Sequence, residues 1–83
     1  MQKYKNLRKI SGVIGYQYGP DYIIVNFKSG KHRFYRYDLT TVSEETLERL
    51  QHLADLGSGL NSALHKKNRI NYSKKGNTFE DVA

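Results

Sequence analysis

The chain has 83 residues, enough for one small domain but not for two, because a typical domain runs to about 100–150 residues. It contains no cysteine, which excludes a disulfide-stabilised scaffold, a thiol enzyme and a zinc site built from cysteines. No apolar run approaches the roughly 20 residues of a membrane span, and no apolar signal segment follows Met1. We therefore expect a soluble cytoplasmic protein without a membrane partner.

The charge is strongly positive and unevenly distributed. Lysine and arginine number 14 against 8 aspartates and glutamates, which gives a formal net charge of +6. Three segments carry bases without a single acid: residues 3–9, 28–36 and 65–75. Such a surface attracts polyanions over a Debye length of about 8 Å at physiological salt. RNA, another polyanion or an acidic protein is the expected partner, and simple solubility is the alternative explanation of the charge.

Three strands are predicted in the first half of the chain. Hydrophobic residues typical of strands occupy Ile10–Tyr18, Tyr22–Lys28 and Lys31–Tyr37. Turn signals separate them at Gly19-Pro20-Asp21 and at Ser29-Gly30. Because a parallel crossover needs about a dozen residues, these short gaps predict an antiparallel meander.

The second turn decides which side chains of the third strand face the core. We expect a three-residue loop, Lys28–Gly30, in which Gly30 adopts the left-handed conformation. This register pairs Ile23 with Tyr35 and places Tyr35 and Tyr37 on the inner face.

Two helices are predicted in the second half. The first begins at a cap provided by Thr41 or Ser43 and ends at Gly57, and Gly59 begins a second, shorter helix. The apolar stripe of the first helix consists of Leu47, Leu50 and Ala54. The predicted fold class is therefore α+β: a three-stranded antiparallel meander followed by two helices packed on one face, in the order βββαα.

The domain is expected to span residues 10–75. Residues 1–9 are polar and basic and form an N-terminal arm, and residues 76–83 form a polar, disordered tail. No repeat or separate linker divides the chain further.

Several short motifs between Ser11 and Tyr72 occur in a recognisable order. They are Ile23-x-Val25-x-Phe27, the Ser29-Gly30 turn, Tyr35-Arg36-Tyr37 and Gly57-Ser58-Gly59-Leu60-Asn61. This pattern resembles the KTSC domain, a small module named after the C-terminus of some lysyl-tRNA synthetases and also found free-standing in bacteria and phages. Leu60 departs from the family pattern, which has an aromatic residue there. The resemblance implies RNA binding, a role suggested for the family.

Phe34 and Arg36 belong to the predicted nucleic-acid-binding surface. They lie on the strand face opposite Tyr35 and Tyr37, where a ring can stack on a base and a guanidinium can meet a phosphate. The alternative is that Phe34 only covers Ile24 as a cross-strand pair.

The bases after the second helix are predicted to contact phosphates, with charge at a helix end and in a solubilising tail as the alternative. The complete set of predicted nucleic-acid-binding residues is Phe34, Arg36, Lys66, Lys67, Arg69, Lys74 and Lys75.

The predicted function is a small non-catalytic RNA-binding module with low sequence specificity, present as a monomer or a weak dimer. A phage or bacterial adaptor or inhibitor that docks on an acidic host protein through the exposed first strand is the alternative. A metal-independent ribonuclease using His65, Arg69 and Tyr72 is a remote one. We predict no catalytic residue, cofactor or metal site, because the three histidines fit no ligand spacing.

Overall fold

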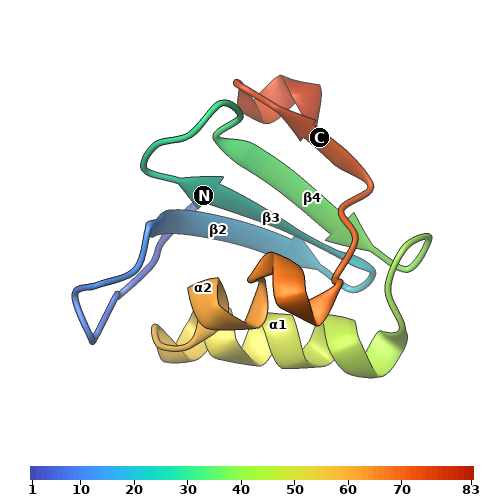
Figure 1. The fold of residues 1–83 in the computed structure, drawn as a ribbon. Helices are drawn as coiled ribbons and strands as arrows, with labels where there is room; N and C mark the ends of the chain where they lie inside the picture. Colours follow the sequence, from blue (N-terminus) through green and yellow to red (C-terminus); the bar gives the residue numbers. More distant parts are fainter.

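The computed structural model describes residues 1–83 as an antiparallel five-stranded sheet with a helix across one face (Figure 1). The strands lie in the sheet in chain order: β1 (Gln2–Lys3), β2 (Val13–Gly19), β3 (Tyr22–Phe27), β4 (Phe34–Asp38) and β5 (Lys74–Gly76). The helices are α1 (Glu44–Leu56), α2 (Leu60–Ala63) and the 3-10 turns η1 (Lys66–Asn68) and η2 (Phe79–Asp81). No helix has the length and apolar character required to cross a membrane.

The predicted βββαα arrangement is wrong, although the protein is α+β. The three expected strands are present as β2, β3 and β4, but β1 and β5 extend the sheet at both edges. The second helix is only the four residues of α2, so α1 is the single long helix. The added strands have two and three residues, too few to show the alternation by which a strand is recognised in a sequence.

The β3–β4 hairpin keeps the predicted faces but not the predicted pairing. Tyr35 pairs with Val25 and Tyr37 with Ile23. The Phe27 N–H donates to the Arg33 carbonyl at 2.7 Å and closes a loop that runs from Lys28 to His32. The difference from the expected register is two residues, and side chains in a strand alternate with a period of two. Tyr35 and Tyr37 therefore still lie on the inner face.

The core lies between this inner face and α1. Ile23, Val25 and Tyr37 are buried there against Leu47 and Leu50 of the helix. The remaining members of the buried cluster are Tyr4, Val13, Tyr16, Ala54, Leu60 and Ala63.

The two ends of α1 follow from local chemistry. Ser43 is the N-cap, since its hydroxyl accepts the Thr46 N–H at 3.1 Å. Gly57 ends the helix with φ +79°, a left-handed conformation that glycine adopts without steric cost.

A tyrosine pair on β2 ties the sheet to α1. The hydroxyls of Tyr16 and Tyr18 both donate hydrogen bonds to the Asp55 carboxylate, and the two rings stack with centroids 6.2 Å apart. Burial, together with the hydrogen bond to Asp55, raises the pKa of Tyr16 to about 12. The same two hydrogen bonds lower the pKa of Asp55, so this contact joins a carboxylate to neutral phenols at neutral pH.

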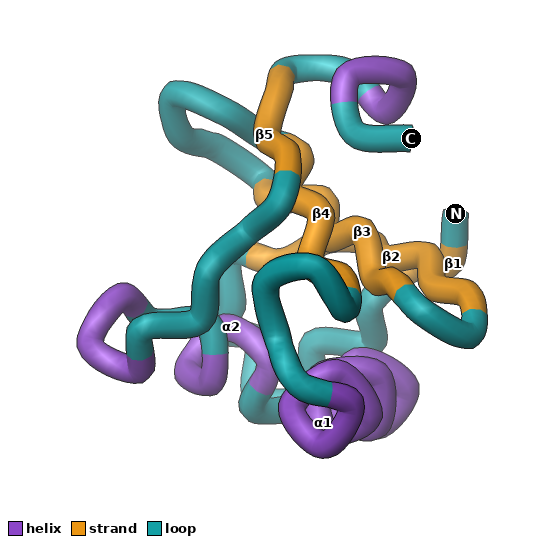
Figure 2. The backbone as a smooth tube through the Cα atoms, turned by 90° about the vertical axis from the view of Figure 1, so that its right-hand side faces the viewer, coloured by secondary structure: helices purple, strands orange, loops and turns teal.

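Both ends of the chain pack against the domain. Strand β1 pairs with β2, the strand whose free edge the adaptor hypothesis needed, and Tyr4 behind it is 2% exposed. The C-terminal segment turns back over the sheet face opposite α1 (Figure 2), and Val82 there is fully buried. An added Cβ at Gly76 would lie 2.2 Å from Cβ of Asp81, so the segment docks where the strand has no side chain.

Candidate nucleic-acid interface

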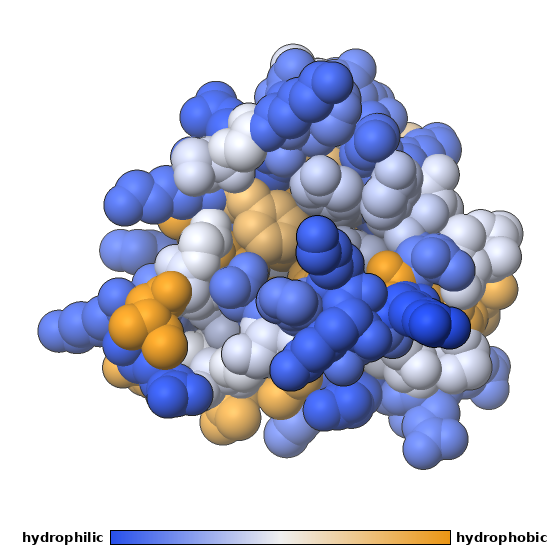
Figure 3. All heavy atoms as spheres, in the orientation of Figure 1, coloured by the Kyte–Doolittle hydropathy of each residue, from blue (hydrophilic) through white to orange (hydrophobic).

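An open cleft of about 370 Å³ lies between the Lys28–His32 loop and the chain that follows α2. We call it the aromatic cleft. Its apolar lining consists of Phe27, Tyr35, Tyr37, Leu64, Ile70 and Tyr72. The space-filling view shows mostly hydrophilic side chains on this side of the molecule, with apolar atoms visible among them near the centre (Figure 3).

Three of the rings form a continuous edge-to-face series. Phe27 and Tyr35 have centroids 5.5 Å apart with planes at 87°, and Tyr35 and Tyr72 have centroids 5.3 Å apart at 74°. This is a favoured geometry for aromatic pairs. Phe27 and Tyr35 are half-buried, whereas Tyr72 at the outer end is 41% exposed. The cleft therefore presents one ring to solvent, supported from behind by two others.

Cations surround these rings. Lys31 and Lys66 are exposed side chains of the cleft wall, and Nζ of Lys75 lies 5.1 Å from the centre of the Tyr72 ring. A hydrogen bond with Tyr72 raises the pKa of Lys75, which keeps this amine charged. No carboxylate lines the cleft, so its electrostatic field favours anions.

The floor of the cleft remains neutral. Tyr37 is 5% exposed, and burial raises the pKa of its hydroxyl well above the ordinary value. The ring therefore contributes apolar surface and no charge under physiological conditions.

His32 in the cleft wall carries an unsatisfied polar atom. Its Nδ1 is the only buried side-chain nitrogen or oxygen in the protein without a hydrogen-bond partner. Such atoms cost about 1–3 kcal/mol and are rare in folded proteins. One polar atom of the Lys28–His32 loop is therefore without a hydrogen bond in the protein.

The structure divides the seven predicted site residues between two faces. Lys66 lines the aromatic cleft and Lys75 covers Tyr72 beside it. Lys67 lies in η1 and Arg69 directly after it, and both side chains are exposed. These four bases lie on the chain that forms one wall of the cleft or continues from it.

Phe34, Arg36 and Lys74 lie on the opposite face of the sheet. Arg36 pairs with Lys74 across β4 and β5, and Phe34 pairs with Gly76. Phe34 is half-buried and lines a shallow pocket with Phe79 of the C-terminal segment. The structure therefore does not bring these three residues together with the aromatic cleft.

Arg36 is occupied by contacts within the protein. Its Nε lies 2.9 Å from a carboxylate oxygen of Asp38, its guanidinium lies 4.5 Å from the centre of the Tyr22 ring, and Nη1 donates to the Val82 carbonyl at 3.5 Å. Burial alone would raise the pKa of Asp38, but hydrogen bonds from Thr40, Arg36 and Ser73 outweigh it and hold that pKa well below the usual range. Arg36 is thus a structural residue of this face.

No local sequence pattern predicts that Tyr35, Tyr72, Lys31 and His32 belong to one site. Tyr35 was expected in the core, where it is in part. Tyr72 lies between the bases of segment 65–75, and this position is the one feature of the sequence that indicates a role for it in binding. The cleft depends on the contact between Tyr35 and Tyr72, which are 37 positions apart in the chain, and no local pattern reports such a contact.

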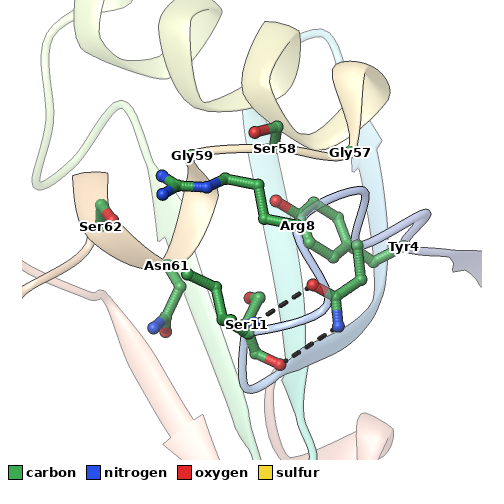
Figure 4. A pocket seen from close by; sticks show the side chains of 10 residues that line it. Tyr4, Arg8, Ser11, Gly57, Ser58, Gly59, Asn61 and Ser62 are labelled. Atoms are coloured by element: carbon green, nitrogen blue, oxygen red, sulfur yellow. Dashed lines mark hydrogen bonds between the residues drawn. The ribbon is translucent and has the colours of Figure 1, made fainter.

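A second, smaller pocket of about 50 Å³ lies beside the N-terminal loop (Figure 4). It is mainly polar and contains Arg8, Ser58 and Ser62 in its lining. It shares no residue with the aromatic cleft.

No protein-family model, curated protein or solved structure matches this chain. The resemblance to KTSC domains accordingly stays a prediction from the short motifs. What the structure defines is a class: a small basic α+β domain with an aromatic cleft between cationic side chains.

Proposed function

We propose that this protein is a small non-catalytic RNA-binding module that holds single-stranded RNA in the aromatic cleft with little sequence preference. One observation carries the proposal: the edge-to-face series of Phe27, Tyr35 and Tyr72 opens among lysines with no carboxylate in the lining.

Tyr72 is the stacking platform. Tyr72 is 41% exposed, and Tyr35 packs against its ring in an edge-to-face arrangement at a centroid distance of 5.3 Å. Stacking of a base on an aromatic side chain contributes about 1–3 kcal/mol and tolerates any base, since every base has a π-face. Only an unpaired strand can present its bases in this way, which favours single-stranded RNA over a duplex.

The lysines supply the phosphate contacts. Lys31 and Lys66 lie in opposite walls of the cleft, and Lys67 and Arg69 continue the positive charge beyond it. Contacts of this kind release counterions and carry no sequence information, so the affinity falls as salt is added.

Two further features agree with this assignment. Nδ1 of His32, which has no hydrogen-bond partner within the protein, belongs to a residue that lines the cleft. At the N-cap of η1, Nδ1 of His65 accepts the Lys67 N–H at 3.2 Å, so only Nε2 of this histidine is left for the proton transfer that a ribonuclease would need.

The test is a fluorescence-anisotropy titration of a labelled single-stranded oligoribonucleotide in about 0.1 M salt. We expect saturable binding, weakened about tenfold by Tyr72→Ala, the equivalent of losing about 1.4 kcal/mol of stacking. Leu39→Ala is the matched control, because the Leu39 side chain is 43% exposed but lies outside the cleft, and it should leave the affinity unchanged.

Two results would overturn the proposal: no binding at roughly tens of micromolar protein, or equal losses in the two variants. The same samples are then run on a denaturing gel, where the RNA should remain intact. Cleavage that disappears in His65→Gln would instead support the ribonuclease alternative.

A further inference from the structure

The small polar pocket beside the N-terminal loop has a different character from the aromatic cleft. It lies between residues 4–11 and the turn that joins α1 to α2 (Figure 4). Its lining consists of Tyr4, Asn6, Arg8, Ile10, Ser11, Gly57, Ser58, Gly59, Asn61 and Ser62.

The N-terminal loop is tied to this turn by backbone contacts. The Leu7 N–H donates to the Gly57 carbonyl at 2.8 Å. Within the loop, the Asn6 side chain accepts the Ser11 N–H at 3.2 Å and donates to the Ser11 carbonyl at 3.4 Å. These contacts fix the backbone on either side of Arg8, whose exposed side chain lines the pocket.

Arg8 is the only charged residue of the lining, and no carboxylate faces it from either wall. The single ion pair of the protein joins Arg36 to Asp38, so the Arg8 guanidinium has no anionic partner. A guanidinium presents parallel N–H donors that match the oxygens of a phosphate. Figure 4 shows the side chain extending past the Ser58 hydroxyl towards Gly59 and Ser62.

A buried tyrosine hydroxyl supplies a second, independent observation. Tyr4 is 2% exposed, and its hydroxyl oxygen accepts the Leu60 N–H at 3.4 Å. The hydroxyl donates no hydrogen bond within the protein, so its proton is available to a ligand in the pocket. The oxygen points towards the Arg8 side chain in Figure 4, so the free donor and the free cation share one pocket.

The size of the pocket limits its ligand. A cavity needs about 10–15 Å³ to hold one water molecule, so about 50 Å³ accommodates roughly three to five oxygen-sized groups. This suits a phosphate group and is too small for a nucleobase. We infer that this pocket binds a phosphate group, either free phosphate or a terminal monoester, through Arg8 and Tyr4 with the hydroxyls of Ser58 and Ser62.

The test is an NMR titration of the isotopically labelled full chain with inorganic phosphate, against sodium chloride at the same ionic strength. Saturable shifts are expected at the amides of Ser58, Gly59 and Asn61. Arg8→Gln should weaken the affinity about tenfold, since it removes a charge-assisted hydrogen bond. Lys9→Gln removes the same charge from an exposed side chain outside the pocket and should have no effect.

Two more arms separate the possible sources of the phosphate. A 5′-phosphorylated dinucleotide and its 5′-hydroxyl twin are titrated in the same way, and a stronger response to the phosphorylated form than to inorganic phosphate identifies a terminal monoester. Arg8→Lys, which keeps the charge but loses the planar donor pair, should bind with intermediate affinity. It replaces Arg8→Gln if that variant does not fold.

The inference is overturned if neither phosphate compound gives saturable shifts at these amides. It is equally overturned if Lys9→Gln loses as much affinity as Arg8→Gln, or if the 5′-hydroxyl dinucleotide binds at these amides as tightly as inorganic phosphate does.

Discussion

Asp38 organises a hydrogen-bond network on the sheet face opposite α1. One carboxylate oxygen accepts from Nε of Arg36 at 2.9 Å and from the Ser73 hydroxyl at 2.8 Å, and the other accepts from the Thr40 N–H at 3.0 Å. The carboxylate therefore connects the end of β4 to the segment that enters β5 and to the turn that leads towards α1.

Replacing this carboxylate tests its role through the pH dependence of stability. The pKa of Asp38 is lowered in the folded protein, so its contribution is complete above the unfolded value of about 3.9 and is lost as the pH falls towards the folded value. Asp38→Asn should cost about 2 kcal/mol at pH 7, the scale of hydrogen bonds to a charged group, and should flatten the decline below about pH 4.

Urea unfolding between about pH 2 and pH 7 measures both effects. Asp21→Asn is the control, because the exposed Asp21 side chain makes no hydrogen bond. If Asp38→Asn and Asp21→Asn had the same acid profile, the network around Asp38 would contribute nothing.

At the scale of elements, the end of α1 requires a glycine. Gly57 has φ +79°, and an added Cβ would lie 2.5 Å from Cβ of Lys5. Gly57→Ala should lower the free energy of unfolding by about 2 kcal/mol or more, since the left-handed conformation alone costs a residue with a Cβ about 1–2 kcal/mol.

Gly12→Ala is the control for Gly57→Ala, because nothing lies within 4 Å of the position that the added Cβ would take. Thermal unfolding should show no loss for this variant. Equal stability of the two variants would mean that the N-terminal loop does not pack on Gly57 as described.

The C-terminal segment is an element in its own right, and Val82 anchors it. Val82 is fully buried and its carbonyl accepts from Arg36. Val82→Ala should cost about 2 kcal/mol, given about 0.8 kcal/mol for each buried methylene and a further term for the cavity. Ala83→Ser at the exposed neighbouring position should be neutral in the same chemical denaturation experiment. A neutral Val82→Ala would show instead that the segment is disordered in solution.

The sequence was informative where elements are long and amphipathic. The run of Ile23, Val25 and Phe27 predicted β3, and the spacing of Leu47 and Leu50 predicted α1, because burial of one face leaves a periodic pattern. Strands β1 and β5 consist of polar residues and glycine, and their backbone groups pair with the edge strands β2 and β4. Because backbone pairing does not require a particular type of side chain, it leaves no pattern in the sequence.

The candidate site could be predicted only in part, for the same reason. Lys66 and Lys75 were identified from local charge, whereas the Phe27–Tyr35–Tyr72 series depends on contacts between distant segments. Arg36 looked available on its strand because the segment that meets it, at Val82, was expected to be disordered.

At the scale of the whole molecule, basic and acidic side chains occupy different parts of the surface, and the cleft lies among the basic ones. The aromatic cleft is lined by bases and no acid, while Glu44, Glu45 and Glu48 are exposed on α1. A polyanion is therefore attracted to the cleft and repelled by the exposed glutamates of α1, and this would orient a strand of RNA before any ring contacts a base.

An NMR titration of the labelled protein with a single-stranded oligoribonucleotide tests this account most directly, since it reports both binding and its location. We predict saturable shifts concentrated in residues 28–37 and 64–75, with the amides of α1 unchanged. The absence of saturable shifts, or shifts concentrated on α1 or around Phe79 and Val82 instead, would contradict the assignment of the aromatic cleft as an RNA site.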